Sequence, residues 1–248
     1  MIVKSKVKYI NSLGDKKQRD ADRVFVAEGP KIINELLAED TVRAVELFAL
    51  KAWIDENGDV PADVHEIDDI LLRRLSFLAT PNKVLGVFTY PKQPVPHFKD
   101  KISLVLDGIQ DPGNLGTIIR CADWFGIEQV VCSRDCADVF NPKTVQSTMG
   151  SIARVKVYYD DVETVIKTSG VKIFATALDG KNIRDIGELS EGIIIIGNES
   201  KGIRENILSL ATERITIPKK GKAESLNAAV ATGIVLSAIC PSPSGSRS

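Results

Sequence analysis

The hydrophobic positions of this chain fall into two patterns that meet near residue 91. Before that point, a helical stripe from Ile32 to Leu37 alternates with strand-like runs at 42–50 and 84–88 and with a second helical face at 67–78. Residues 91–96 then contain three prolines, which exclude a helix or a central strand and favour a semi-rigid linker. We therefore predict a small first domain over 1–95 and a larger second domain over 96–240.

The second region repeats strand and helix patterns at the spacing of βαβ units. Strands are predicted at 102–107, 128–132, 153–158, 171–177, 192–197 and 213–217, and helices at 114–125, 141–149, 161–169, 203–210 and 225–239. The run from Ile193 to Ile196 is apolar without alternation, which is typical of a strand covered on both faces. The pattern predicts an α/β domain with a mainly parallel sheet and helices on both faces. Residues 241–248 are rich in Pro, Ser and Gly and are predicted to be a disordered tail.

Charge adds only local features to this picture. The net charge of the 248 residues is −1, so no whole-molecule field attracts nucleic acid. Residues 4–23 contain seven basic and three acidic side chains, a net charge of +4. This excess of positive charge indicates either an RNA-docking patch or a solvated terminus. The basic members are Lys4, Lys6, Lys8, Lys16, Lys17, Arg19 and Arg23. A second basic patch comprises Lys219, Lys220 and Lys222.

Cysteine, histidine and hydropathy patterns argue against several classes of protein. Cys121, Cys132, Cys136 and Cys240 form no C-x-x-C pair, and the sequence has only two histidines, so we expect no metal site. Unpaired cysteines suit a reducing compartment. The N-terminus lacks a secretory apolar region, and the longest apolar stretch, at 228–240, is too short to span a bilayer. We therefore expect a cytoplasmic protein with no membrane partner.

Three polar segments follow predicted strands and form the candidate chemistry. They are residues 104–120, 193–203 and 215–231. In an open parallel sheet, ligands bind beyond the carboxyl ends of the strands, so the three segments are expected to converge on one pocket. The glycines at 108, 113 and 116 match neither the dinucleotide-binding pattern nor the P-loop. A nicotinamide site or a nucleotide-hydrolysing site is therefore disfavoured.

Individual polar residues in these segments also have structural interpretations. Asn114 is placed to cap the following helix, and Ser225 is placed to cap the last one. Glu199 precedes a helix that it could cap. Arg120 lies in an apolar helix, where it either snorkels to solvent or has a function, and Asn227 is unexpected in the first turn of a helix.

Together and in this order, the three motifs resemble the signature of the TrmH/SpoU family, the ribose 2'-O-methyltransferases of RNA in the SPOUT superfamily. The resemblance covers roughly Ile102 to Ile239. It implies S-adenosyl-L-methionine as cofactor and methylation of a ribose in structured rRNA or tRNA. It assigns the active site to Asn114, Arg120, Glu199, Ser225 and Asn227. It assigns cofactor binding to Gly197, Ile217 and Leu226, together with Leu178 and Asn198, of which Asn198 also lies close to the active site.

The resemblance also implies features that generic folding rules would not suggest. Family members tie the catalytic domain into a trefoil knot and form homodimers, with both subunits near each active site. The first ninety residues resemble, more loosely, the family's ribosomal-protein-like α/β substrate-binding domain, mainly through Phe25 to Gly29. One departure is Gln146 to Ser151, where the family often has Arg-Ala-Ser-x-Gly and hence a further phosphate contact.

The chemistry leaves two roles for Arg120 open. A guanidinium essentially never deprotonates, so Arg120 acts as a base only with help from a phosphate or carboxylate. Otherwise it clamps the phosphate beside the target ribose. Two other functions remain: an enzyme of another class with a nucleotide cofactor, and a non-catalytic RNA-binding protein on the same scaffold. The presence of all five active-site residues argues against lost catalysis.

Overall fold

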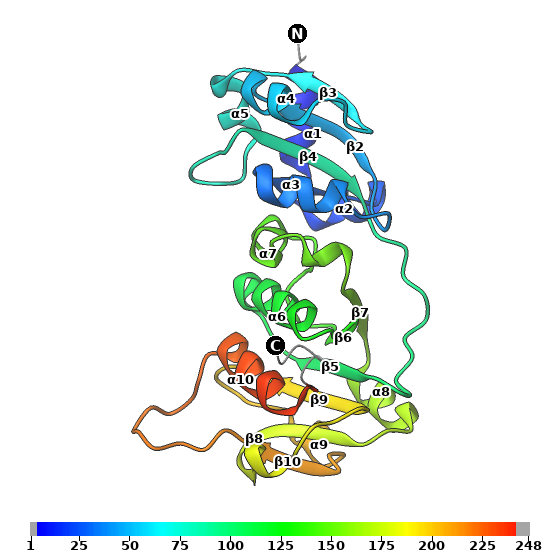
Figure 1. Ribbon diagram of the computed structural model, residues 1–248, viewed down its shortest axis with the longest axis vertical. Coiled ribbons are helices and arrows are strands. Elements are labelled where there is room, and N and C mark those ends of the chain that lie inside the picture. Colours follow the sequence, from blue (N-terminus) through cyan, green and yellow to red (C-terminus); the bar gives the residue numbers. More distant parts are fainter. Residues whose placement is uncertain (1–3, 242–248) are drawn as a thin grey trace, which may run out of the picture. The chain divides into compact units, whose positions relative to one another are not determined.

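The computed structural model describes residues 4–241, and the predicted tail at 242–248 lies outside the described residues. The chain divides into two compact units. The first comprises Met1–Gln93 and Asp138–Arg154, and the second comprises Pro94–Ala137 and Val155–Ser248. Residues 138–154 follow the strand predicted at 128–132 and thus belong to the larger domain in sequence. In the structure they cluster with the N-terminal region (Figure 1).

The first unit is built on a four-stranded sheet in the order β1-β4-β2-β3. Its strands are β1 (Val24–Glu28), β2 (Ala44–Ala49), β3 (Asp63–Glu66) and β4 (Val84–Thr89). Strand β4 pairs antiparallel with β1 and β2, whereas β3 runs parallel to β2. The helices are α1 (Lys4–Ser12), α2 (Lys16–Asp22), α3 (Pro30–Leu37), α4 (Lys51–Asn57), α5 (Asp69–Leu75) and α7 (Pro142–Thr148), with the 3-10 helix η1 (Ser151–Ala153).

Local chemistry explains how β1 turns into α3. All five residues of β1 are buried, including Glu28. Gly29 follows with φ +89, a conformation that suits glycine, and Pro30 then occupies the first turn of α3, where its missing N–H costs nothing. The Glu28 carboxylate accepts hydrogen bonds from Ser76 Oγ and from Phe77 N at 2.8 Å. These bonds hold the loop after α5 against the end of β1.

The segment Asp138–Arg154 packs into the first unit through aromatic and ionic contacts. Phe140 stacks on Tyr90, with ring centroids 3.7 Å apart, and on Phe25 at 5.3 Å. Arg19 is 1% exposed and binds Asp138 Oδ2 at 2.5 Å and Leu13 O at 2.7 Å. Because Arg19 is buried in this ion pair, it cannot contribute to a basic surface at the N-terminus.

The second unit contains a six-stranded, all-parallel sheet in the order β10-β8-β9-β5-β6-β7. Its strands are β5 (Ile102–Asp107), β6 (Gln129–Ser133), β7 (Lys156–Asp160), β8 (Ile173–Asn182), β9 (Gly192–Gly197) and β10 (Glu213–Thr216). The helices are α6 (Pro112–Trp124), α8 (Val162–Ser169), α9 (Glu205–Leu208) and α10 (Ala228–Ile239), with the 3-10 helix η2 (Ile183–Asp185). The prediction of an α/β domain with a parallel sheet is confirmed.

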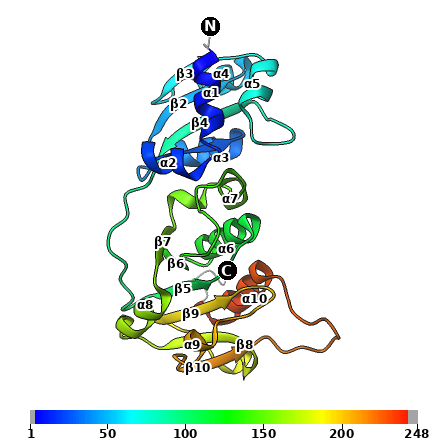
Figure 2. The same cartoon turned by 180° about the vertical axis from the view of Figure 1, so that it is seen from behind.

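Helices cover both faces of this sheet. Odd-numbered residues of the central strands, such as Val105 and Ile195, pack with α8 and α9 in one core cluster. Their even-numbered neighbours, such as Leu106 and Ile196, point to the other face because successive side chains alternate, and they are buried as well. Helices α6 and α10 pack against each other in the second layer (Figures 1 and 2).

Several predicted element bounds differ from the structure. The last helix begins at Ala228 rather than at residue 225, so residues 217–227 form a long loop. The helix predicted at 203–210 is reduced to the single turn of α9. Strand β8 extends to Asn182, five residues beyond its predicted end, because its distal part pairs with β10 after a register shift. Among residues 4–241, no helix is long and apolar enough to cross a membrane.

Candidate active site

The carboxyl ends of the parallel strands bring the first two motifs together. Asp107, the last residue of β5, lies directly opposite Gly197, the last residue of β9. On the other side of β9, Thr216 Oγ1 of β10 lies 3.4 Å from Leu178 O of β8. All three motifs therefore begin at one edge of the sheet, as their strand-end positions predict.

Helix α6 presents Asn114 to the second motif. The N-cap of α6 is Asp111, whose carboxylate accepts a hydrogen bond from Asn114 N at 2.9 Å. The prediction that Asn114 caps the helix is therefore wrong, because Asp111 already occupies that position. The side chain of Asn114 lies in the first turn and donates from Nδ2 to Glu199 Oε1 at 2.5 Å.

The third motif joins the same network through Asn227. Its Nδ2 donates to Asn114 Oδ1 at 2.9 Å, and its Oδ1 accepts from Ala229 N at 3.0 Å and Val230 N at 3.2 Å. Asn227 is thus the N-cap of α10, and the prediction that Ser225 caps this helix is wrong. Ser225 lies exposed in the preceding loop, three residues before the first helical residue. The polar chain Asn227–Asn114–Glu199 links all three motifs.

Asn198 organises the turn that carries Glu199. Its Oδ1 accepts from Ser200 N and Lys201 N, both at 3.0 Å, and its Nδ2 donates to Gly108 O at 2.8 Å. The chain folds back so closely that a Cβ at Gly197 would lie 2.4 Å from the backbone of Gly202. Only glycine fits at this position, because the backbone of Gly202 occupies the space that a side chain would need.

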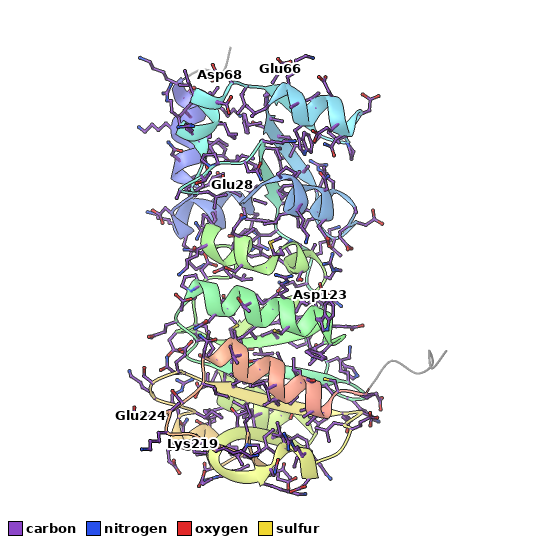
Figure 3. All side chains as sticks on the ribbon, turned by 60° about the vertical axis from the view of Figure 1, so that its left-hand side comes forward. Glu28, Glu66, Asp68, Asp123, Lys219 and Glu224 are labelled. Atoms are coloured by element: carbon purple, nitrogen blue, oxygen red, sulfur yellow. The ribbon has the colours of Figure 1, made fainter. Side chains whose placement is uncertain are left out.

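The predicted cofactor residues form an exposed apolar margin at this edge. Leu178 is 79% exposed and Leu226 is 44% exposed, while Ile217 is half-buried. Leu226 belongs to the loop 217–227, which projects from the second unit and also carries Lys219 and Glu224 (Figures 1 and 3). Exposed leucines suit a ligand with a flat apolar face.

Arg120 does not join the polar network within one chain. It is exposed on α6, two turns beyond Asn114, and it makes no hydrogen bond or ion pair with any residue in the range 4–241. It shares one face of the helix with the exposed side chains of Thr117 and Trp124 and with the half-buried Cys121, which follow the three- and four-residue spacing of a helix face. Its guanidinium is therefore available to a group from outside the chain.

Sequence reasoning missed an ion pair beside this network. Asp107 is 1% exposed, and its carboxylate accepts from Arg204 N at 2.8 Å and from Arg204 Nε at 2.7 Å. The signal available in the sequence was an aspartate at the end of an apolar strand. Nothing in the local pattern around Arg204 identifies its partner, because the two residues are far apart in sequence.

A thiol also contacts the first motif. Cys136 Sγ accepts a hydrogen bond from Ile109 N at 3.2 Å and lies 3.4 Å from Ser133 Oγ. Hydrogen bonds from the Cys132 thiol, and next from Ser133 and Ile109, lower the pKa of Cys136 to about 7. All four cysteines are free. Within residues 4–241, no group of three or more potential ligands is arranged to hold a metal ion.

Comparisons with known proteins agree with this geometry. The profile of the SpoU rRNA Methylase family matches residues 101–237, and that of the MRM3-like substrate binding domain matches residues 4–86. The chain is 31% identical to the 23S rRNA (guanosine(2553)-2'-O)-methyltransferase RlmP of Bacillus subtilis, over 93% of this chain and 94% of the relative.

Solved structures show the same relationship. A protein of the TrmH family from Porphyromonas gingivalis is 34% identical, with a TM-score of 0.86, and the match covers 96% of this chain and 98% of that one. An AdoMet-bound rRNA methyltransferase from Sinorhizobium meliloti is 30% identical, with a TM-score of 0.84, and the match covers 96% and 95%. Because the family profile spans more than half of the chain and the sequence relationship extends over nearly all of it, this protein belongs to the SpoU rRNA methylase family.

Proposed function

We propose that this protein transfers the methyl group of S-adenosyl-L-methionine to the 2'-hydroxyl of a ribose in ribosomal RNA. Membership of the family makes it an RNA methyltransferase and favours catalysis over a non-catalytic role on the same scaffold. The observation that carries the proposal is the polar chain Asn227–Asn114–Glu199 beside an exposed apolar margin. Ribosomal RNA is favoured over tRNA because the Bacillus subtilis relative is named for 23S rRNA.

The residues present fit the cofactor. Leu178 and Leu226 expose apolar side chains that would cover the adenine, and the closely approached backbone at Gly197 would supply hydrogen-bonding groups. Ile217 completes this margin, while Asn198 holds the turn in place. When bound, S-adenosylmethionine supplies an electrophilic methyl group on a sulfonium. The protein's own task is to hold the ribose hydroxyl in line with that methyl group.

Glu199 and Asn114 are the groups suited to orient the ribose. The Glu199 carboxylate is fixed by the amide of Asn114, which is fixed in turn by Asn227. A carboxylate held in this way accepts a hydrogen bond from a hydroxyl and prepares it for attack. Ser225, in the adjoining loop, is placed with these residues by family resemblance. The exposed lysines at 219, 220 and 222 would attract RNA phosphates to the same loop.

Arg120 is proposed to act across a homodimer. The exposed apolar residues of the α6–α10 layer are Trp124, Val230 and Ile234, which are 84%, 52% and 39% exposed. A second copy of the chain would cover these side chains. Arg120 lies on the same helical stripe as Trp124, so dimerisation would bring it towards the partner subunit's site. There it would clamp a phosphate or, with that phosphate, help to remove the ribose proton.

The finer features of fold and organisation are proposed on the same basis. The long loop 217–227 between β10 and α10 is consistent with a chain that threads a trefoil knot. The region 1–95 is proposed to dock RNA and 96–240 to carry out catalysis, in a cytoplasmic protein.

The basic N-terminal cluster is smaller than its sequence suggests, because Lys6 pairs with Glu46 at 2.6 Å, Lys16 pairs with Asp20 and Arg19 is buried. Docking must therefore use the remaining cations or another surface.

Mapping of 2'-O-methyl groups tests the substrate. Ribosomal and transfer RNA from cells with and without the protein should differ at one or a few ribose positions of ribosomal RNA. A missing mark confined to tRNA would overturn the choice of substrate, and no missing mark would remove the proposed activity.

Calorimetry with S-adenosylmethionine should show binding at roughly micromolar Kd, near −8 kcal/mol. Gly197→Val should weaken that binding sharply, because its side chain has no room.

Substitution of Arg120 tests its catalytic role. Arg120→Ala should abolish methyl transfer and leave cofactor binding unchanged, because the side chain contacts no part of the cofactor margin. Arg120→Lys should restore little activity, since lysine keeps the charge but loses the planar fork. Mixing Arg120→Ala subunits with subunits that carry Glu199→Gln should recover part of the activity if each site uses both chains. Near-normal turnover of the alanine variant would transfer both roles away from Arg120.

A further inference from the structure

The ion pair between Asp107 and Arg204 closes the turn that carries Glu199. Asp107 has almost no solvent contact, yet its carboxylate receives three bonds from one residue: Arg204 N at 2.8 Å, Nε at 2.7 Å and Nη2 at 2.5 Å. The guanidinium contacts Oδ1 through both Nε and Nη2, while the backbone N–H of Arg204 donates to Oδ2, so one residue fixes both carboxylate oxygens. Hydrogen bonds to Asp107 raise the pKa of Arg204, so the guanidinium stays charged.

Both ends of the turn are attached to the first motif. At its start, Asn198 Nδ2 binds Gly108 O at 2.8 Å. At its end, Arg204 binds Asp107, the residue just before Gly108. Between these anchors, Asn198 and Gly202 exchange two backbone hydrogen bonds at 3.1 and 2.9 Å, which makes the turn a closed loop. The position of Glu199 therefore depends on two contacts, one with Asp107 at the end of β5 and one with Gly108, the next residue.

The same piece of chain leads into α6 and Asn114. Gly108 N binds Ser133 Oγ at 2.9 Å, and Asp111 then caps the helix on which Asn114 lies. The contact between Asn114 Nδ2 and Glu199 Oε1 thus closes a ring that begins and ends at Asp107. A change in the Asp107–Arg204 contact would shift Glu199 relative to Asn114 without touching either residue.

We propose that Asp107 and Arg204 are a positioning pair for methyl transfer, which holds Glu199 in register with Asn114 and the target ribose. This inference rests on the proposed function. Arg204 is a positioning residue rather than a catalytic one, because it reaches the site only through the turn. A misplacement of about 1 Å in a reacting group can lower a rate by roughly 100-fold, so a small shift of this turn has a measurable effect.

Two variants separate positioning from folding. Arg204→Lys keeps the charge but loses the two-pronged grip, and its turnover should fall about tenfold with little change in the KM for RNA. The paired change Asp107→Asn with Arg204→Gln leaves no buried charge unpaired, so the protein should keep a thermal midpoint close to that of the unchanged chain. If positioning is the role, turnover of this folded double variant stays about tenfold low. Full recovery of turnover together with stability would overturn the proposal.

A matched control uses another arginine of the second unit. Arg214 binds Asp179 Oδ2 at 3.0 Å and is 40% exposed, compared with 52% for Arg204, but it lies outside the turn and the network. Arg214→Lys should therefore keep normal turnover. A loss in this control equal to that of Arg204→Lys would count against a specific role for Arg204.

Coupling to Glu199 is the decisive measurement. Single-turnover methylation of total ribosomal RNA, isolated from cells lacking the protein, is followed with labelled S-adenosylmethionine for Arg204→Lys, Glu199→Gln and the combination of both. If Arg204 acts through Glu199, Arg204→Lys should cause no further loss once Glu199 is changed. Losses of activity that multiply when the two substitutions are combined would overturn the proposal. A raised KM for RNA with a reduced salt dependence in Arg204→Lys would also overturn it, because this result would indicate a direct phosphate contact. Failure of the unchanged protein to methylate any RNA would instead reject the proposed function.

Discussion

At the scale of single residues, three asparagines hold the candidate site together, and each uses both sides of its amide. Asn114 donates to Glu199 and accepts from Asn227, Asn198 donates to Gly108 O and accepts from two backbone N–H groups, and Asn227 donates to Asn114 while capping α10. Aspartate could reproduce only the accepting half of each role. The amide is therefore required wherever one residue must both shape the backbone and orient a neighbour.

Substitutions of Asn227 should separate the accepting role of its amide from the donating role. Asn227→Asp keeps an acceptor for the N-terminus of α10, so the thermal midpoint should change little, whereas methyl transfer should fall strongly because the donor to Asn114 is lost. Asn227→Ala removes both functions and should also cost about 1 kcal/mol, which lowers the midpoint by roughly 2–4 °C. Calorimetric scans beside methylation assays provide the comparison. Full activity in Asn227→Asp would show that the donor is dispensable.

Cys136 should titrate near neutrality. Hydrogen bonds from Cys132, Ser133 and Ile109 lower its pKa to about 7 from the ordinary value of 9.0. Because the pKa is lower in the folded state, this group contributes stability that is complete above pH 9 and lost as the pH falls through 7. The stability difference between the unchanged protein and Cys136→Ser should therefore widen between pH 7 and pH 9. A difference that is constant over this range would contradict the prediction. Cys121→Ser is a control of opposite sign, because burial raises the pKa of Cys121.

At the scale of elements, the segment Asp138–Arg154 is the least expected feature. It lies between β6 and β7 in sequence, but its residues pack with β1, α2 and α3 of the first unit. Arg154 Nη1 binds Glu35 and Glu39, each at 3.0 Å, and Thr41 Oγ1 donates to Ala153 O at 2.6 Å. The chain therefore passes between the two units three times, so the proline-rich linker at 91–96 is not their sole connection.

Truncation of Phe140 should destabilise the first unit. Its ring is 8% exposed and stacks between Tyr90 and Phe25, so Phe140→Ala should cost about 3–5 kcal/mol. Urea unfolding followed by tryptophan fluorescence of Trp53, which is buried in this unit, measures the loss. Ile70→Ala, at a side chain that is 72% exposed, should change stability by less than about 0.5 kcal/mol. Equal effects of the two substitutions would mean that the segment contributes little to the unit.

At the scale of the whole molecule, the side chains proposed for catalysis do not all meet within one chain. The network at the sheet edge contains Asn114, Glu199 and Asn227, while Arg120 lies away from it on the exposed α6–α10 layer. Large apolar side chains are exposed on the same layer. Assembly of two copies through this layer would complete the site and cover the apolar surface together.

Charge placed on this layer should separate the copies. Trp124→Glu combined with Ile234→Lys should convert a dimer into monomers in sedimentation velocity, because both side chains are exposed within one chain and would be buried between two. Methyl transfer should be lost with dimerisation. The same measurement on Ile70→Lys, in the first unit, provides a control for added surface charge. A monomeric unchanged protein with full activity would contradict the homodimer.

The sequence by itself determined the parallel α/β domain, its strand order along the chain and the three motifs at strand ends, because apolar runs and strand-end polar residues are local signals. Family resemblance then pointed to Asn114, Glu199 and Asn227, which the structure links by hydrogen bonds. Helix caps were assigned wrongly at Asn114 and Ser225, since several polar residues compete near each helix start and only backbone geometry selects one.

Tertiary structure alone decided which distant residues meet. Asp107 and Arg204 are separated by 97 residues, and Arg19 and Asp138 by 119, so no periodicity connects them. Both are ion pairs that involve a buried group, and burial of a charge is stable only when the fold delivers its partner. Local sequence patterns specify elements, whereas the pairing of buried charges depends on how those elements pack.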